Sequence, residues 1–336
     1  MVDIKLLATL QPAFTHFSRF SRDERLSGIR LNNPQWSPTE LGLLLQSPSI
    51  TEAQVPLYFD VKGWQLRVTE LHRNDEFLDI TINHPIKVDT PTPVHFKAGA
   101  DRALLERVEQ DGRRLIFRGG PRHVVYPGES LQIRHPSLEV LGEQFCADEL
   151  EKISVARKAG ITRYFLSYAE SQPDVYRLQE LVGADAEIMI KIENEKGIAY
   201  AAKQFRKRSN HTLVAARGDL YVEVKRPHDI LDALRVIVSR DPEACVGSRL
   251  MLSVINSPVP ACSDFCEMAW LYDIGYRSFL LCDELCLQED LLNVAIGACE
   301  AFRRDYNPPV TPSVVPSVAE TSRSVLPAWM RVFGRR

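Results

Sequence analysis

The chain has 336 residues, a length that suits one large α/β domain carrying one inserted module. Hydrophobic residues make up 45% of it and charged residues 25%, proportions typical of a globular protein with a substantial core. The formal net charge of −3 provides no general attraction to nucleic acid or to anionic lipid, and we expect no nucleic-acid partner. Any basic binding site must therefore be local.

The amino-terminal segment, Met1–Leu10, contains one lysine, no long apolar run and no small-residue cleavage site, so we expect no signal peptide. No stretch approaches the roughly 18 uninterrupted apolar residues of a membrane-spanning helix. The seven cysteines are an odd number scattered through apolar segments, which is typical of reduced thiols in a reducing compartment. We therefore expect a cytoplasmic protein without a transmembrane segment.

Three short apolar segments near the amino terminus predict β-strands at Lys5–Thr9, Gly28–Leu31 and Val55–Asp60. The pattern then changes: between residues 67 and 135, valine, isoleucine and phenylalanine alternate with polar residues. Asp111-Gly112 and Pro127-Gly128 mark turns within this stretch. Residues 67–135 are thus predicted to form a small β domain, a lid, inserted after the third strand.

From residue 136 to 305, short apolar runs alternate with amphipathic stretches, which indicates repeated strand–helix units and a parallel sheet. Strands are expected at Arg163–Leu166, Glu187–Ile192, Thr212–Ala215, Gly247–Leu252 and Arg277–Leu281. Helices are expected at Gln172–Val182, near Pro227–Val238, at Ser263–Asp273 and at Gln288–Arg303. The total of eight strands favours an α/β fold, a closed (β/α)8 TIM barrel formed by residues 1–66 and 136–305.

The last segment, residues 306–336, is rich in proline, serine, threonine and valine up to Val325 and too poor in large apolar groups to fold alone. We expect a disordered tail. Its end, Leu326–Arg336, mixes apolar side chains with three arginines, so a docking or membrane-surface segment is one interpretation and a frayed terminus the simpler one.

Lys191 and Glu193 are two residues apart on a predicted strand, so their side chains leave the same face of the sheet. Burying both in a barrel is unfavourable unless they pair with each other or serve a ligand. Barrel enzymes place their chemistry at the carboxyl ends of the strands, where these residues are expected. A structural ion pair is the simpler alternative.

Asp219 adds a second carboxylate at the matching end of the next strand. Two carboxylates with open positions for substrate oxygens are typical of Mg²⁺ or Mn²⁺ sites in phosphoryl transfer. Gly218 allows the backbone to approach an anion closely, and a helix starting nearby would direct free N–H groups toward that anion. The pattern therefore favours a functional site over a structural pair.

Two segments of the chain resemble the barrel of the pyruvate kinase family: Ile190–Gly197, and Ala216–Leu220 followed by Val222–Val224. Shorter segments resemble the second, third and fourth strands of that barrel: Arg30–Asn32, Asp60–Gly63 with Arg67, and Phe165–Tyr168. The resemblance covers roughly Lys5–Arg67 and His135–Phe302 and fades within the lid, which is shorter than the family's. The family's C-terminal regulatory domain has no counterpart.

The resemblance implies the glycolytic phosphotransfer between phosphoenolpyruvate and ADP, giving pyruvate and ATP. It implies that Glu193 and Asp219 bind Mg²⁺ or Mn²⁺, which holds phosphoenolpyruvate, and that Lys191 faces the forming enolate. Arg30 would contact the transferring phosphoryl group, and Arg67 would help to hold the nucleotide phosphates.

Three further positions follow from the same resemblance. Asn32 and Asp60 match two ligands of the family's monovalent cation, but Pro34 stands where a serine ligand is expected, which puts a K⁺ requirement in doubt. Ser248 aligns with the threonine associated with protonating the enolate. The neighbouring Arg249 replaces a glutamine, and strand alternation is expected to turn it away from Ser248.

Departures from the family concentrate at the nucleotide edge. Trp64 and Gln65 replace a proline and a glutamate, and Tyr221 replaces a glycine, so bulk enters where a nucleotide should pass. A metal-dependent lyase or aldolase acting on pyruvate or another 2-oxo acid is therefore an alternative function. A catalytically weak, ligand-sensing relative is a third, against which the retained charged residues argue. A homo-oligomer is compatible with the sequence.

The lid also carries a basic cluster that could meet polyphosphate or could simply face solvent on a one-sided sheet. Its members are Arg113, Arg114, Arg118, Arg122 and His123.

Overall fold

A computed structural model describes residues 2–32, 36–73 and 77–308, of which those up to Tyr306 belong to one compact unit. Pro34 and residues 309–336 of the expected tail lie outside the described residues. No helix in the described part of the chain is both long enough and apolar enough to cross a membrane.

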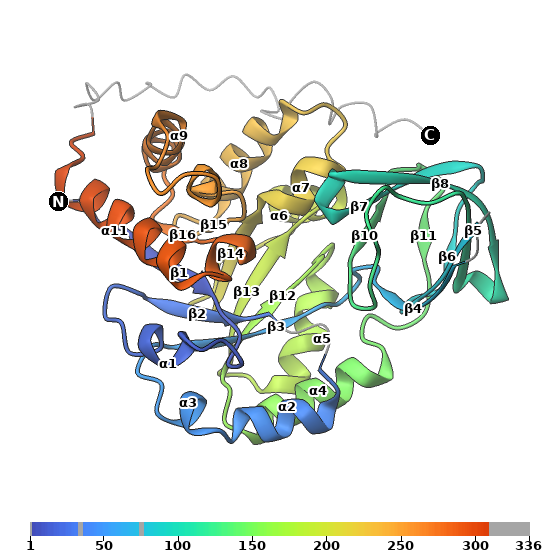
Figure 1. The fold of residues 1–336 in the computed structure, drawn as a ribbon, viewed down its shortest axis with the longest axis horizontal. Helices are drawn as coiled ribbons and strands as arrows, with labels where there is room; N and C mark the ends of the chain where they lie inside the picture. Colours follow the sequence, from blue (N-terminus) through green and yellow to red (C-terminus); the bar gives the residue numbers. More distant parts are fainter. Residues whose placement is uncertain (1, 33–35, 74–76, 309–336) are drawn as a thin grey trace. The chain divides into compact units, whose positions relative to one another are not determined.

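Within these residues, eight parallel strands close a barrel in the order β1-β16-β15-β14-β13-β12-β3-β2, with helices between strands (Figure 1). The predicted α/β barrel is thereby confirmed. The strands are β1 (Lys5–Thr9), β2 (Gly28–Leu31), β3 (Leu57–Val61), β12 (Arg163–Leu166), β13 (Glu187–Ile192), β14 (His211–Ala216), β15 (Cys245–Gly247) and β16 (Ser278–Leu280).

Most strand residues are buried on both faces, because one face fills the barrel and the other packs under helices. The barrel interior holds a cluster formed by Leu7, Phe165, Met189, Val214, Cys245 and Leu280.

The expected strand Gly247–Leu252 was wrong. β15 ends at Gly247, and Ser248, Arg249 and Met251 adopt positive φ angles of 64°, 60° and 55°. This left-handed backbone cannot continue a strand, so the chain leaves the sheet and enters the 3₁₀ helix η3 (Leu252–Ile255). The apolar residues after Gly247 contribute to the core without forming a strand.

The α-helices cover the barrel and connect its strands. They are α1 (Phe17–Phe20), α2 (Pro38–Leu45), α3 (Pro48–Thr51), α4 (Ala147–Lys158), α5 (Gln172–Val182), α6 (Glu195–Lys203), α7 (Arg217–Glu223), α8 (Asp229–Arg240), α9 (Cys262–Asp273), α10 (Asp283–Cys286) and α11 (Glu289–Asp305). The amino terminus of α2 shows the local logic: the Ser37 side chain accepts a hydrogen bond from the Glu40 N–H, and Glu40 bonds back to the Ser37 N–H.

Between β3 and β12 the chain forms a six-stranded antiparallel sheet in the order β10-β7-β8-β9-β5-β4 (Figure 1). Its strands are β4 (Val68–Arg73), β5 (Phe77–Ile82), β7 (Thr92–Phe96), β8 (Asp101–Glu109), β9 (Arg114–Arg118) and β10 (Leu131–Ile133). A separate pair joins β6 (Ile86–Lys87) to β11 (Glu139–Val140), and short 3₁₀ helices η1 (Lys97–Gly99) and η2 (Gln110–Gly112) lie in the connections. The sheet has its own apolar core and occupies the position of the predicted insertion. We call the sheet and its connections the lid.

Candidate active site

A cavity of about 1060 Å³ opens at the carboxyl ends of the barrel strands. It is lined by eight of the nine predicted site residues: Arg30, Asn32, Arg67, Lys191, Glu193, Gly218, Asp219 and Ser248. The ninth, Asp60, lines a second cavity of about 690 Å³, which shares Arg67 with the first. Barrel topology thus gathers residues that lie far apart in the sequence.

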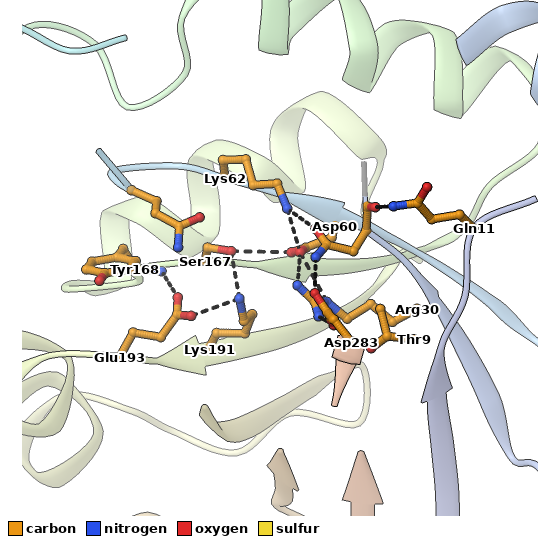
Figure 2. Close-up of polar contacts among 12 residues, drawn as sticks. Thr9, Gln11, Arg30, Asp60, Lys62, Ser167, Tyr168, Lys191, Glu193 and Asp283 are labelled. Atoms are coloured by element: carbon orange, nitrogen blue, oxygen red, sulfur yellow. Dashed lines mark hydrogen bonds and ion pairs between the residues drawn. The ribbon is translucent and has the colours of Figure 1, made fainter. Parts of the chain in front are cut away.

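Lys191 and Glu193 both line the cavity, and Figure 2 shows their side chains directed toward each other. Lys191 Nζ lies 2.8 Å from Glu193 Oε1, and the two side chains are only 7% and 1% exposed. The same ammonium donates to Ser167 Oγ over 3.0 Å. Directly after Glu193, the Asn194 side chain accepts from the Gly197 N–H and begins α6, which fixes the backbone at this point.

Burial raises the pKa of Glu193 to about 7; Lys191 opposes this rise, and the nearby Asp219 adds to it. Its other oxygen, Oε2, accepts a hydrogen bond of 2.7 Å from the Tyr168 N–H.

Asp219 lies in the first turn of α7, and its Oδ1 accepts a hydrogen bond of 2.6 Å from Gln132 Nε2 of the lid strand β10. A Cβ atom on Gly218 would stand 3.4 Å from both Cβ and Oγ of Ser248. Gly218 therefore lies directly beside the Ser248 side chain. Burial and the charge of Asp219 raise the pKa of Glu223, at the end of α7, to about 8.

Ser248 is held by its backbone, because its carbonyl accepts hydrogen bonds from Arg217 Nε at 3.1 Å and Nη2 at 2.6 Å. The prediction that Arg249 turns away from Ser248 was wrong, since both line the same cavity and neither belongs to a strand. The Arg249 guanidinium lies 5.1 Å above the Tyr221 ring and donates to Ala98 O of the lid over 3.1 Å. The bulky Tyr221 thus supports an arginine at the cavity rim.

The opposite side of the site, at the ends of β2 and β3, is a network of paired charges (Figure 2). Both Arg30 Nε and Nη2 donate to Asp60 Oδ2, and Arg30 Nη1 donates to Asp283 Oδ1 over 2.9 Å. Burial opposes the charge of Arg30, but Asp60 and Asp283 outweigh it and raise the pKa of the guanidinium. Arg30 therefore lines the cavity while its guanidinium is paired with two carboxylates.

Lys62 stands between the two predicted ligands of a monovalent cation. Its Nζ donates to Asn32 Oδ1 over 2.6 Å and lies 2.7 Å from Asp60 Oδ2. Burial lowers the pKa of Lys62 to about 7, whereas Arg30, Lys191 and Lys62 together overcome burial and hold the pKa of Asp60 well below its ordinary value. Asn32 and Asp60 are thus close together, but the amine of Lys62 lies between them.

Arg67 and the neighbouring departures from the family make contacts of their own. Arg67 donates from Nε to Gln65 Oε1 over 3.0 Å and from Nη1 to Gly128 O, which ties the start of the lid to its end. Trp64 Nε1 donates to Asp174 Oδ1 over 3.0 Å. Gln65 and Trp64 are therefore structural partners of the lid junction and of α5.

Two of the five members of the lid's basic cluster pair with acidic residues of the lid. Arg114 pairs with Asp79, and Arg118 Nε lies 2.8 Å from Glu106 Oε1. Arg113 Nη1 donates to Asn83 O over 2.6 Å. These contacts favour the solvent-facing interpretation of the cluster.

Sequence reasoning missed several residues at the site. Tyr168 and Ser167 lie in the segment that resembles the family's fourth strand, which could have drawn attention to them. Gln132 offered no signal, because its place beside Asp219 depends on how the lid docks. Within the described residues, no group of three or more His, Cys, Asp or Glu side chains is arranged to hold a metal ion. A cation at Glu193 and Asp219 would need water or substrate oxygens as further ligands.

Comparison of the chain with protein-family models finds no match, and a search of curated proteins finds none either. The resemblance to pyruvate kinase therefore depends on the motifs alone.

Proposed function

We propose that the protein transfers a phosphoryl group between phosphoenolpyruvate and ADP with a divalent cation, giving pyruvate and ATP. The observation that carries this proposal is the arrangement of Lys191, Glu193 and Asp219 in one cavity at the carboxyl ends of neighbouring barrel strands. The motifs that resemble pyruvate kinase supply these three residues.

Mg²⁺ or Mn²⁺ fits the donor set at Glu193 and Asp219. Glu193 Oε1 is buried, and the Lys191 ammonium lies 2.8 Å from it. An additional positive charge would lower the raised pKa of this carboxylate. When bound, the cation supplies Lewis-acid polarisation of substrate oxygens.

The chain's own residues would stabilise and then protonate the enolate. The Lys191 ammonium is fixed by Glu193 and Ser167, so it presents a positive charge in a set position as the bond between phosphorus and the enol oxygen breaks. The Ser248 side chain lines the same cavity beside Gly218, and its hydroxyl would deliver the proton to the methylene carbon. Arg67, which lines both cavities, would face the nucleotide phosphates.

K⁺ does not fit the site as it stands. Both predicted ligands, Asn32 and Asp60, already contact Lys62 Nζ, which occupies the place between them. We therefore assign no step of the reaction to a monovalent cation.

A second candidate is a metal-dependent lyase or aldolase acting on a 2-oxo acid. The observation that favours it is the pairing of Arg30 with Asp60 and Asp283, which reduces the positive charge left for a transferring phosphoryl group. The enolate-stabilising side of the site would serve such an enzyme unchanged.

A coupled assay separates the two candidates. We expect pyruvate and ATP to form from phosphoenolpyruvate and ADP with Mg²⁺, and expect Glu193→Ala to abolish this activity. Omitting ADP should stop pyruvate formation. No ATP formation, combined with nucleotide-independent cleavage of a carbon–carbon bond in 2-oxo acid substrates, would replace phosphotransfer with the lyase.

A further inference from the structure

Two exposed cysteines lie in contact on α9. Of the seven cysteines, four are buried and one is half-buried, whereas Cys262 and Cys266 are exposed. Their Sγ atoms are 3.8 Å apart. Free cysteine is among the residue types most often buried, and an exposed thiol is the kind that oxidants reach. The two exposed thiols of this chain are thus also the two that touch, which indicates a site of thiol chemistry.

The spacing of the two cysteines explains why they meet. Cys262 is the first residue of α9 and Cys266 follows four residues later, so their side chains lie one turn apart on the same face. The buried residues of this helix, Asp264, Met268 and Leu271, lie on the other face. Both thiols therefore remain open to solvent at the start of the helix.

The pair differs from two independent thiols in how it holds its protons. The hydrogen bond with Cys262 and the negative charge of that sulfur raise the pKa of the Cys266 thiol. Once Cys262 is ionised, Cys266 therefore keeps its proton and donates it to the Cys262 sulfur. One sulfur is then available as a nucleophile, and a thiol stands beside it to resolve the product.

We propose that Cys262 and Cys266 are a redox-modification site, a dithiol that hydrogen peroxide converts into a reversible disulfide. The change reaches the cavity at Ser248. This inference is independent of the reaction proposed above.

The oxidation proceeds in two displacements. The Cys262 thiolate attacks one oxygen of the peroxide, the O–O bond breaks, and the departing hydroxide takes up a proton to become water. Cys262 is then a sulfenic acid. The Cys266 sulfur attacks the Cys262 sulfur, the S–O bond breaks, and a second water leaves with the Cys266 proton. The two thiols lose two electrons, and the peroxide is reduced to two waters.

The disulfide must distort the start of α9. Side chains four residues apart on a helix have Cβ atoms about 5–6 Å apart. A disulfide needs Cβ atoms about 3.5–4.5 Å apart. Because Cys262 is the first residue of the helix, the change falls on the first turn. Strained disulfides are the more easily reduced ones, which suits a reversible modification.

One contact of this first turn reaches η3. Asp264 Oδ2 accepts hydrogen bonds from the Ala261 N–H over 2.9 Å and from the Ser253 hydroxyl. Asp264 thus joins the beginning of α9 to the segment that follows the cavity residues at the end of β15. A distorted first turn would weaken this junction.

A second contact reaches Ser248. Glu267, the residue after Cys266, places its Oε1 2.5 Å from Arg217 Nη1. The same guanidinium donates two hydrogen bonds to the Ser248 carbonyl. Movement of α9 at Cys266 is therefore transmitted to the backbone of a residue that lines the main cavity.

The test treats the full chain with hydrogen peroxide, blocks the remaining thiols by alkylation and digests with trypsin for mass spectrometry. The tryptic peptide Leu250–Arg277 contains both cysteines and no other. We expect it to lose the mass of two hydrogen atoms and to take up no alkylating reagent. Dithiothreitol should restore both thiols.

Three serine variants supply the controls. Cys262→Ser and Cys266→Ser should each prevent the loss of two hydrogen atoms from this peptide. Cys146→Ser, which changes the half-buried cysteine outside α9, is the matched control and should form the disulfide as the parent does.

Hydrogen exchange measures the link to the cavity. Peroxide should speed amide exchange across 248–256 in the parent and in Cys146→Ser, and dithiothreitol should reverse this. Exchange in Cys262→Ser should not respond. A peptide that keeps both thiols, or that passes directly to sulfinic acid, would overturn the redox site. A disulfide that leaves exchange across 248–256 unchanged would overturn its link to Ser248.

Discussion

The two sides of the site hold their charged residues in different ways. At the ends of β2 and β3, Arg30, Lys62, Asp60 and Asp283 bind one another. At the ends of β13 and β14, Glu193 pairs with the single ammonium of Lys191, and the Asp219 carboxylate accepts from the neutral amide of Gln132. Ser167 joins the two sides, since it accepts from Lys191 Nζ and donates to Asp60 Oδ1 over 3.3 Å.

A structural network and a binding site can be distinguished by the partners of their buried charges. A buried charge whose partners all lie in the chain needs no ligand, and removing one partner should cost stability. A buried acceptor without a partner marks a place where a ligand contributes, and removing it should cost function. The resemblance to pyruvate kinase alone would have treated both sides as catalytic.

The largest expected effect is on activity, at the β13 side. Lys191→Met should lower the turnover of phosphoenolpyruvate and ADP by roughly 10³-fold, because it removes charge aimed at the developing enolate. Circular dichroism should show the folded barrel. A variant that keeps the parent's turnover rate would end the assignment of this side as catalytic.

The next effect is on stability, at the β3 side. Asp60→Asn leaves Arg30 and Lys62 without their shared carboxylate in a fully buried position, so the free energy of unfolding should fall by roughly 3–5 kcal/mol. Urea denaturation measures it. Asp283→Asn is the control: its side chain is 46% exposed, so it should cost less than about 1 kcal/mol. Equal losses in the two variants would contradict the buried network.

A smaller effect on stability is expected at the opposite end of the barrel. It must be distinguished from the effects of the Lys191 and Asp60 variants. Burial lowers the pKa of His211 from 6.5 to about 4, and its Nε2 lies 2.8 Å from Gln179 Oε1. The folded state thus binds this proton less readily than the unfolded state, so stability is present above pH 6.5 and lost as pH falls toward 4.

At pH 5 this linkage should remove at most about 2 kcal/mol relative to pH 7. Urea denaturation of the parent and of His211→Asn at both pH values measures it. The variant should lose less stability than the parent on acidification, and an identical loss in both would assign the pH dependence to other groups.

The smallest expected effect is that of K⁺. Because Lys62 Nζ contacts both Asn32 and Asp60, replacing K⁺ by tetramethylammonium should leave the rate unchanged. A rate that depends on K⁺ would show that Lys62 leaves this position during turnover.

The alternation of short apolar runs with amphipathic stretches predicted the barrel, because each buried strand requires a short apolar run in the sequence. The same pattern failed at β15, where residues with positive φ angles follow Gly247 and end the strand. Hydrophobicity does not indicate the sign of φ, so the apolar residues there predicted a strand. The Lys191, Glu193 and Asp219 cluster could be predicted, since spacing on neighbouring parallel strands fixes it. The pairing of Arg30 with Asp283 could not, because it depends on closure of β1 against both β2 and β16.

We propose that the side of the cavity at Lys191, Glu193 and Asp219 stabilises a pyruvate enolate. The most direct measurement is the exchange of pyruvate methyl protons with deuterium oxide, followed by nuclear magnetic resonance with Mg²⁺ and without nucleotide. We expect the parent protein to catalyse this exchange and both Lys191→Met and Glu193→Ala to lose it. Exchange no faster than in Mg²⁺ buffer alone would contradict the claim.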